Sequence, residues 1–228
     1  MAVIAENLAA IERRIADAAL AAGRFVTDVR LLPVSKTRPA SELAEAMACG
    51  YKRFGENRVQ EVVAKAAVLP EAEWAVIGHL QSNKARQVAE LASEFQALDS
   101  LELASQLDRR LHTAGRRLDT LIQVNSSGED SKFGLPPGEV VAFARDLEPF
   151  DALRVRGLMT LALPGSDREA VAACFVRMRE LQDDLRQAGA LGSDWDELSM
   201  GMSGDFELAI AYGATCVRVG TAIFGARA

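Results

Sequence analysis

The 228-residue sequence contains only three cysteines, and none of them is arranged for chemistry. Cys49, Cys174 and Cys216 are far apart and lie in apolar contexts, which is typical of reduced core residues in a cytoplasmic protein. No histidine lies near any of them in the sequence, so a catalytic thiol is not expected. Their spacing fits no metal site either, and we expect no bound metal.

Long apolar runs and an excess of basic residues are also absent. No segment approaches the roughly eighteen apolar residues that a membrane span requires. Glu6, Glu12 and Asp17 interrupt the N-terminal segment, where a signal peptide needs an apolar run. The formal net charge of -6 argues against a general nucleic-acid-binding protein, which usually presents a basic face. We therefore expect neither a membrane nor a nucleic acid as a partner.

The sequence does contain a regular alternation of amphipathic and apolar segments. The first amphipathic segment predicts a helix over residues 4–22, because apolar residues from Ile4 to Ile15 recur at helical spacing. Ser166 and Glu169 form a capping box that predicts the start of a long later helix. The other predicted helices cover residues 39–48, 57–68, 138–147, 166–187 and 203–211, with two more beginning near residues 82 and 101. The predicted strands cover residues 31–36, 51–55, 74–80, 94–100, 118–125, 153–161, 196–201 and 215–225.

Strict alternation of strands and helices predicts parallel strands joined by crossover helices. Eight such units in a chain of this length predict a (β/α)8 TIM barrel, which is an α/β fold, with an extra N-terminal helix. No linker divides the chain, so residues 1–228 are expected to form a single domain. The alternative is an open doubly wound sheet. The absence of a Gly-x-Gly-x-x-Gly motif after the first strand disfavours it.

The first predicted strand, LLPVSK, ends in Lys36 at the point where a buried parallel strand gives way to a helix. A lysine at this place can extend its ammonium group into solvent, which is the commoner case. Partial burial would instead lower the pKa of its amine and make it a nucleophile that forms a Schiff base with a carbonyl carbon. Active sites of barrels lie at the carboxyl ends of the strands, so the other strand ends test the second interpretation.

Polar residues recur at the carboxyl ends of the other predicted strands. Each has a structural alternative: Asn57 can be a helix N-cap with Gln60 three residues later, and His79 can be a hydrogen-bonded core histidine. His112, the two tyrosines and the loop residue Lys132 receive no predicted role. The residues at strand ends are Lys36, Glu56, Asn57, His79, Asn125, Met159, Thr160, Ser199 to Gly204, Gly220 and Thr221.

Two glycine-containing turns favour a phosphate site. The segment SMGMSGD, residues 199–205, leads into a helix, so its main-chain N–H groups can point at an anion. The segment VGT, residues 219–221, follows the eighth strand, which neighbours the seventh in a barrel. The loops after these two strands are the usual phosphate site of this fold. A tight turn with Ser203 as an N-cap is the alternative for the first segment taken alone.

Arg218 lies within the apolar segment of the eighth strand. Successive side chains of a strand point to opposite faces, so one face of this strand should carry Arg218, Gly220 and Ala222. A buried arginine needs a partner, which is either a carboxylate of another strand or a ligand.

Two chemistries combine a Schiff-base lysine with a phosphate site on such a barrel. A class I aldolase acting on a sugar phosphate takes its lysine from a late strand and has acid and base carboxylates beside it. Here Lys36 lies on the first strand, and Glu56 is the only acid at a predicted strand end. Pyridoxal 5'-phosphate (PLP) chemistry, in which the cofactor carries the aldehyde, fits better.

Seven segments spread over nearly the whole chain resemble the pyridoxal phosphate homeostasis protein family, the YggS/PROSC-type proteins related to the N-terminal domain of alanine racemase. The segments are VSK (34–36), FGENRVQE (54–61), IGHLQSNK (77–84), SKFG (131–134), RGLMT (156–160), LSMGMSGD (198–205) and VRVGTAIFG (217–225). The sequence departs from the family pattern at Gly204, where Asp or Ala is more usual.

The resemblance implies a fold-type III PLP barrel in which Lys36 carries the cofactor as a covalent aldimine. It implies that the phosphate is held by Ser199, Ser203, Gly220 and Thr221. It implies that Arg218 faces the pyridine nitrogen and that Asn57, His79 and Met200 line the cofactor. No residue is assigned a catalytic role.

The resemblance also implies a function: storage and delivery of PLP, and balance of vitamin B6 and amino-acid pools, without an established catalytic reaction. PLP accepts electrons best when its ring nitrogen is protonated, and the permanent charge of Arg218 disfavours that protonation. The alternative is a stand-alone PLP-dependent amino-acid racemase. It lacks the second base, a tyrosine from an additional domain, since this chain ends at Ala228. We expect a cytoplasmic monomer that contacts apo PLP-dependent enzymes only transiently.

Overall fold

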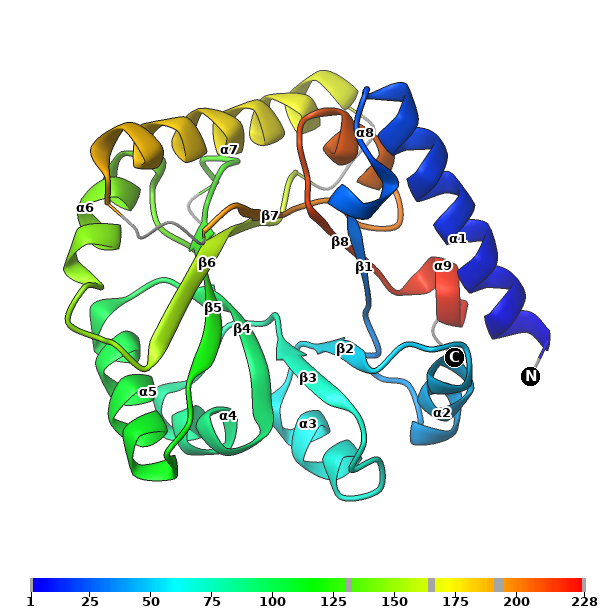
Figure 1. Cartoon of the computed structure of the whole chain (residues 1–228), viewed down its shortest axis with the longest axis horizontal. Helices are drawn as coiled ribbons and strands as arrows, with labels where there is room; N and C mark the ends of the chain where they lie inside the picture. Colours follow the sequence, from blue (N-terminus) through cyan, green and yellow to red (C-terminus); the bar gives the residue numbers. More distant parts are fainter. Residues whose placement is uncertain (1, 130–132, 164–166, 191–194, 227–228) are drawn as a thin grey trace.

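The computed structural model describes residues 2–129, 133–163, 167–190 and 195–226. Figure 1 shows its strands arranged in a ring with the helices outside, and helix α1 lies along α8 and α9. The strands are β1 (Arg30–Pro33), β2 (Arg53–Glu56), β3 (Glu73–Val76), β4 (Ala92–Leu98), β5 (Leu118–Val124), β6 (Leu153–Thr160), β7 (Glu197–Ser199) and β8 (Cys216–Val219). The α-helices are α1 (Ala2–Ala21), α2 (Ala40–Ala48), α3 (Val59–Ala66), α4 (Ala85–Leu91), α5 (Leu101–Ala114), α6 (Val140–Asp146), α7 (Arg168–Ala188), α8 (Phe206–Ala211) and α9 (Thr221–Phe224). Three short 3-10 helices are η1 (Val26–Asp28), η2 (Ser82–Lys84) and η3 (Pro137–Glu139).

The strands pair in the order β1-β8-β7-β6-β5-β4-β3-β2, and each pair is parallel. Between β1 and β2 an isolated bridge joins Val34 to Gly55, and the Ser35 N–H donates to Gly55 O at 2.9 Å. This bridge nearly closes the sheet into a ring. The predicted (β/α)8 barrel with an N-terminal helix is therefore confirmed, and the open-sheet alternative is wrong.

The apolar core lies between the ring of strands and the surrounding helices. On α1 the predicted stripe from Ile4 to Ile15 is buried in this layer. On β8, Val217 and Val219 are buried in the same layer, whereas Arg218 between them reaches the interior of the barrel. The predicted alternation is confirmed for Arg218 and Gly220, but not for Ala222, which packs against the apolar core because β8 ends at Val219. Across the described ranges, no helix combines the length and the apolar character that crossing a membrane demands.

Several strands end earlier than the sequence predicts, most clearly the first, third and eighth. The first was expected to reach residue 36, but β1 ends at Pro33. The eighth was expected to continue to residue 225, but β8 ends at Val219, and α9 follows Gly220. The Ile223 N–H donates to Gly220 O at 2.9 Å, which starts the helix. The third was expected to reach residue 80, but β3 ends at Val76. A short apolar segment has the same composition whether it forms a strand, a helix or a buried loop. Composition alone therefore could not show where these strands end.

The start of α7 also differs from the prediction. The N-cap is Asp167, whose side chain accepts from the N–H groups of Glu169 and Ala170 at 3.0 and 3.1 Å. Ser166, the predicted member of the capping box, lies outside the described residues. Aspartate one position later supplies the same acceptor for the first turn of the helix.

Candidate functional site

A cavity of about 600 Å³ lies at the carboxyl ends of the strands, where a barrel of this type holds its site. Nine binding residues were predicted from the sequence, and seven of them line this cavity. They are Lys36, Asn57, His79, Ser203, Arg218, Gly220 and Thr221. The fold therefore brings together the ends of β1, β2, β3, β7 and β8 around one space.

Lys36 follows β1 and is partly buried at the cavity wall. Ser35, the residue before it, is fully buried and held at two points. Its hydroxyl donates to Glu56 Oε1 at 2.6 Å, and its carbonyl accepts from Lys65 Nζ at 2.8 Å. The main chain that carries Lys36 is therefore anchored to β2 and α3.

Thr37, the residue after Lys36, is held as well. Its φ of 64° lies in the left-handed region that non-glycine residues rarely adopt. Its N–H donates to Glu61 Oε2 at 2.7 Å, and the same oxygen lies 3.1 Å from Lys65 Nζ. We call Glu56, Glu61 and Lys65 the brace, because they fix the main chain on both sides of Lys36.

The brace is a buried ionic network. Lys65 is 7% exposed, and its ammonium group contacts both carboxylates. Burial raises the pKa of the Glu56 carboxyl. Burial acts in the same direction on Glu61, but hydrogen bonds from the Thr37 N–H and from Lys65 outweigh it and lower the pKa of that carboxyl. Because such pairs add little net stability but are costly to break, the brace is suited to fixing a geometry.

Arg218 reaches the cavity from inside the barrel and is 3% exposed. Its guanidinium donates to Ser199 Oγ and to Thr160 O, both at 2.7 Å, and it makes no ion pair with any carboxylate of the described residues. Ser199 donates to Gln96 Oε1 at 2.7 Å, and Gln96 donates to Glu94. Burial lowers the pKa of Arg218. A buried guanidinium without a contacting carboxylate favours an electron-rich ligand group in the cavity.

The two remaining predicted residues, Ser199 and Met200, do not line the cavity. Both are fully buried. The Ser199 hydroxyl is shared between Arg218 and Gln96, and Met200 packs in the apolar core. The chain turns back toward the cavity only after Gly201, whose φ is 93°. The part of the motif that borders the cavity therefore begins at residue 202.

The turns after β7 and β8 present unpaired donors. The main-chain N–H groups of Ser203, Gly204, Thr221 and Ala222 donate no hydrogen bond within the described parts of the chain. Three of these residues line the cavity. The alternative role of Ser203 as an N-cap is wrong, because the N-cap of α8 is Asp205. Unpaired N–H groups gathered in a concave turn are typical of a phosphate site.

His79 lies at the cavity after β3 and stacks on Phe133, with ring centroids 4.0 Å apart and planes inclined by 12°. Its Nδ1 lies 3.8 Å from Asp99 Oδ2, and burial raises the pKa of that carboxyl. The alternative of an enclosed core histidine is wrong, because 40% of the side chain is exposed. His79 therefore has a face available to a ligand.

Asn57 also lines the cavity, and the N-cap of α3 is Arg58 rather than Asn57. The neighbouring Gly78 allows a very close approach of two loops. A Cβ atom at Gly78 would lie 2.3 Å from Asn57 O, so no other residue fits there without displacing the main chain. This contact joins the loops after β2 and β3 beside the cavity.

Gln123 and Phe133 are among the cavity wall residues that were not predicted from the sequence. Asn125 was selected on this strand, but its Nδ2 donates to Glu129 O at 2.8 Å and shapes the following loop. A glutamine inside the apolar segment 118–125 was the available signal for Gln123. Phe133 lies in the segment SKFG (131–134), but no role was predicted for it. Lys132, which received no predicted role, lies outside the described residues.

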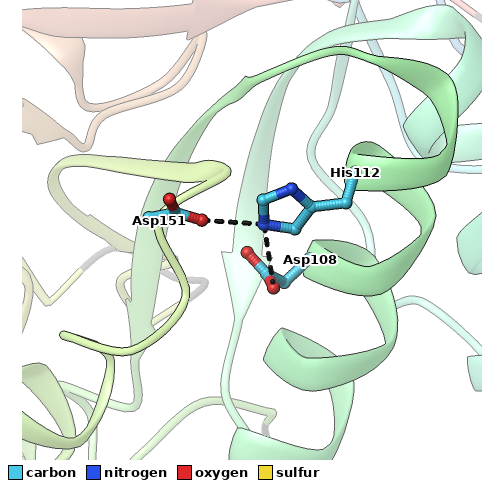
Figure 2. Close-up of side chains that lie close together, drawn as sticks. All are labelled: Asp108, His112 and Asp151. Carbon is cyan, nitrogen blue, oxygen red and sulfur yellow. Dashed lines mark hydrogen bonds and ion pairs between the residues drawn. The ribbon is translucent and has the colours of Figure 1, made fainter.

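Figure 2 shows a separate cluster of Asp108, His112 and Asp151, where α5 meets the turn before β6. His112 Nε2 lies 2.7 Å from Asp151 Oδ1 and 3.6 Å from Asp108 Oδ2. Asp108 Oδ1 accepts from the Ala152 N–H at 3.0 Å. The three side chains offer one nitrogen and two oxygens to a metal ion. Their mutual contacts also account for the arrangement, since they tie α5 to the start of β6.

The barrel and the cavity at its strand ends define a class of protein, the barrels related to alanine racemase. The family model described as "Alanine racemase, N-terminal domain" matches residues 6–228. An alanine racemase of Clostridium difficile 630 shares the fold with a TM-score of 0.78 and 16% identity, covering 100% of this chain and 57% of that one. At that identity the likeness shows the fold alone.

Within that class, the chain belongs to the pyridoxal phosphate homeostasis protein family. It is 46% identical over 229 residues to the pyridoxal phosphate homeostasis protein of Pseudomonas aeruginosa, covering 100% of this chain and 97% of that one. The structure of PipY of Synechococcus elongatus PCC7942 with PLP bound has a TM-score of 0.84 and 38% identity, covering 97% of this chain and 100% of that one. The family expected from the motifs is confirmed.

Proposed function

We propose that this chain binds PLP in the cavity at the strand ends and that Lys36 holds it as a Schiff base. The observation that carries the proposal is the position of Lys36, on a braced turn that opens into the same cavity as the buried Arg218. The PLP-bound structure of PipY, a close relative, supports it. The proposed contacts are Ser203, Gly220 and Thr221 with the phosphate, Arg218 with the ring nitrogen, and Asn57 and His79 with the ring.

The donors present fit this group. Unpaired main-chain N–H groups of the turns after β7 and β8 match an anionic phosphate. Arg218 offers N–H donors to a neutral ring nitrogen, which is an acceptor. Ser199, expected to contact the phosphate, instead acts through Arg218, and Met200 supports the wall from the core.

Covalent attachment is a condensation. The amine of Lys36 attacks the aldehyde carbon, and the carbonyl oxygen leaves as water, so that a carbon–nitrogen double bond replaces the carbon–oxygen double bond. Bound PLP supplies an electron-accepting ring. Arg218 disfavours a second positive charge on the ring nitrogen and so favours holding the group over carbanion chemistry.

The role that follows is storage and delivery of PLP to apo enzymes in the cytoplasm, by a single-domain monomer that maintains vitamin B6 and amino-acid pools. Stand-alone racemase activity is the alternative. It needs a second base, and the two tyrosines lie away from the cavity: Tyr51 donates to Glu12 at 2.6 Å, and Tyr212 borders a different hollow. The three cysteines are free thiols, which fits a reducing compartment.

The test is an absorption spectrum of the purified protein with PLP, before and after borohydride, followed by peptide mapping. We expect a visible band that reduction removes and a label on the peptide containing Lys36. Lys36→Ala should abolish the label, and Lys52→Ala, at an exposed lysine of the same protein, should retain it. A protein that takes up no PLP, or a label on another lysine, would contradict the proposal.

Delivery is tested separately by mixing the loaded protein with an apo PLP-dependent enzyme and following recovery of that enzyme's activity. If the protein delivers PLP, the enzyme should regain activity faster with the loaded protein than with the same concentration of free PLP in buffer. Optical rotation of alanine or serine solutions with the loaded protein tests the racemase alternative, and a change would favour it.

A further inference from the structure

The interior of the barrel holds a row of buried polar side chains, where barrels of this type usually carry branched apolar ones. We call it the polar row; it consists of Glu94 and Gln96 on β4, Ser199 on β7 and Arg218 on β8, each 3% exposed or less. Gln96 contacts Ser199 although β5 and β6 lie between their strands in the sheet, so this contact crosses the interior of the ring. Buried polar groups are costly unless they are fully paired, so their presence inside a barrel needs a reason.

Each hydrogen bond of the polar row points the same way, from the cavity toward Glu94. A carboxylate only accepts hydrogen bonds, so the Gln96 amide must turn its Nε2 toward Glu94 and its Oε1 away from it. That Oε1 accepts from the Ser199 hydroxyl at 2.7 Å. A hydroxyl has a single proton, so the Ser199 oxygen is left as an acceptor for Arg218 Nη1, also at 2.7 Å. Glu94 thus sets the direction of every bond as far as Arg218.

Glu94 is itself fixed at the end of the barrel opposite to the cavity. Its Oε1 accepts from Arg30 Nη2 at 2.7 Å, and its Oε2 accepts from Arg53 Nη1 at 3.0 Å. These arginines are the first residues of β1 and β2, so the polar row begins at the amino ends of strands. Within the described ranges, no side-chain atom of the polar row is buried without a hydrogen-bond partner. A fully paired network of this kind is rigid, because a change in one bond leaves a buried polar group unpaired.

The polar row holds the guanidinium of Arg218 in one orientation. Its Nη1 donates to Ser199, and its Nη2 donates to Thr160 O at 2.7 Å. A guanidinium is planar, so two contacts made through different nitrogens fix its plane as well as its position. An arginine has five N–H donors, and those not used in these two bonds remain for a ligand in the cavity that Arg218 lines.

We propose that Gln96, anchored by Glu94, is a positioning residue that fixes Arg218 where it donates to the ring nitrogen of PLP; this inference rests on the function proposed above. Gln96 does not border the cavity, so it acts on the cofactor only through Ser199 and Arg218. Without Gln96 the Ser199 hydroxyl loses its acceptor, and its proton is free to turn toward Arg218. The guanidinium then loses one of its two contacts inside the barrel, and its plane is no longer fixed.

The experiment compares PLP with its 1-deaza analogue, in which a C–H group replaces the ring nitrogen. Both compounds keep the aldehyde, the ring hydroxyl and the phosphate, so the ratio of their dissociation constants reports the contact at the ring nitrogen. Equilibrium dialysis measures both constants for the wild type and for Gln96→Met, which keeps the length of the side chain and removes both of its hydrogen bonds.

We expect the wild type to prefer PLP, and this preference to fall about fivefold in Gln96→Met, which is the scale of one hydrogen bond. A loss of stability or a change in the cavity that affects both compounds alike cancels in the ratio. A merely structural role of Gln96 therefore leaves the ratio unchanged.

Gln182 provides a matched control, because it is a buried glutamine outside the barrel interior. It lies on α7, its Nε2 donates to Asp196 O at 3.0 Å, and it borders a hollow other than the cavity. Gln182→Met should keep the wild-type ratio. Gln96→Asn serves where the methionine variant does not fold, since it keeps an amide beside Glu94 but is too short to bridge Glu94 and Ser199. The same fall in preference is expected.

The outcomes separate the two proposals. An unchanged ratio in a folded Gln96 variant overturns the positioning role and leaves PLP binding intact. An equal fall in Gln182→Met also overturns it, because the effect is then not local. A wild type that binds both compounds equally well overturns the contact between Arg218 and the ring nitrogen, and the role of Gln96 with it. A wild type that binds neither compound overturns the proposed function itself.

Discussion

The ammonium group of Lys65 lies 2.8 Å from the carbonyl oxygen of Ser35, the residue that precedes Lys36. One lysine of the chain is thus enclosed among carboxylates, and it holds the turn that presents another lysine to the cavity. The two amines have opposite tasks. Lys65 is paired with two carboxylates, whereas Lys36 needs a neutral amine to attack a carbonyl carbon.

Replacement of Lys65 should therefore damage both stability and PLP attachment. Lys65→Met leaves the buried Glu56 without its cation, and we expect a loss of about 3 kcal/mol in the free energy of unfolding. Urea unfolding measures this loss, and borohydride labelling at Lys36 measures attachment. The exposed Lys52 provides the control, since Lys52→Met should change stability by less than about 0.5 kcal/mol. Reduced stability with wild-type PLP affinity would show that the brace does not position Lys36.

The lowered pKa of Glu61 gives the brace a pH dependence of defined sign. An acid whose folded-state pKa is depressed stabilises the fold above its unfolded value, here 4.5, and this contribution disappears as the pH falls through the depressed pKa. The wild type should therefore lose stability more steeply below pH 4.5 than Glu61→Gln does. Thermal unfolding at a series of pH values measures the difference. Burial raises the pKa of Glu56, and the Glu61 charge adds to this shift, so Glu56 contributes with the opposite sign and partly offsets the difference between the two proteins.

Glu71→Gln, at an exposed carboxylate, is the control for this comparison and should follow the wild-type profile. Parallel profiles for the wild type and Glu61→Gln would contradict the assigned role of the Thr37 N–H and Lys65.

Substitution of Gly78 should disturb the cavity through the neighbouring loop. A Cβ atom there would lie 2.3 Å from Asn57 O, so Gly78→Ala must displace the main chain at Asn57. Overpacking of this kind costs about 1–3 kcal/mol, and PLP affinity should fall with it. Gly138→Ala adds a Cβ atom with nothing within 4 Å and should leave both unchanged. Calorimetry and dialysis measure the two effects, and equal behaviour of the two variants would refute the prediction.

Ser199→Ala distinguishes direct phosphate binding from positioning of Arg218. If Ser199 acts through Arg218, PLP affinity falls about tenfold, while binding of inorganic phosphate to the apo protein stays at its wild-type level. Direct contact predicts that both affinities fall. Ser93→Ala removes a hydroxyl that donates to Trp74 O at 3.3 Å, away from the cavity, and serves as the control. Isothermal titration of the wild type and both variants with each ligand gives the six affinities.

The sequence was most informative about the ends of apolar strands and about the alternation of side chains along them. The position of Lys36 at the cavity could be predicted because the apolar first strand leads to it, although β1 itself ends at Pro33. The inward direction of Arg218 followed from alternation along β8. Ser199 and Met200 could not be placed, because β7 has only three residues and the chain then turns at Gly201 with a positive φ. A motif shows which residues act together, but it does not show which of them face the ligand.

Long-range contacts were the other limit of the sequence. Lys65 read as an ordinary helical lysine, because Ser35 and Glu56 approach it only in the folded barrel. Phe133 was not selected because its stacking on His79 joins loops that follow different strands. The end of β8 at Val219 depended on a helical turn that apolar composition does not distinguish from a strand.

Beside Lys36 the ring of strands is joined by an isolated bridge, between Val34 and Gly55, rather than by a ladder. The Ser35 N–H donates to Gly55 O there, and the side chains of Glu56 and Lys65 add contacts to Ser35. Local opening at this place breaks fewer backbone contacts than opening anywhere along the β5–β6 ladder, so amide hydrogen exchange at Ser35 should be faster than in those strands. The covalently held cofactor would then lie where the barrel opens locally, so that its release needs no unfolding of the other strands.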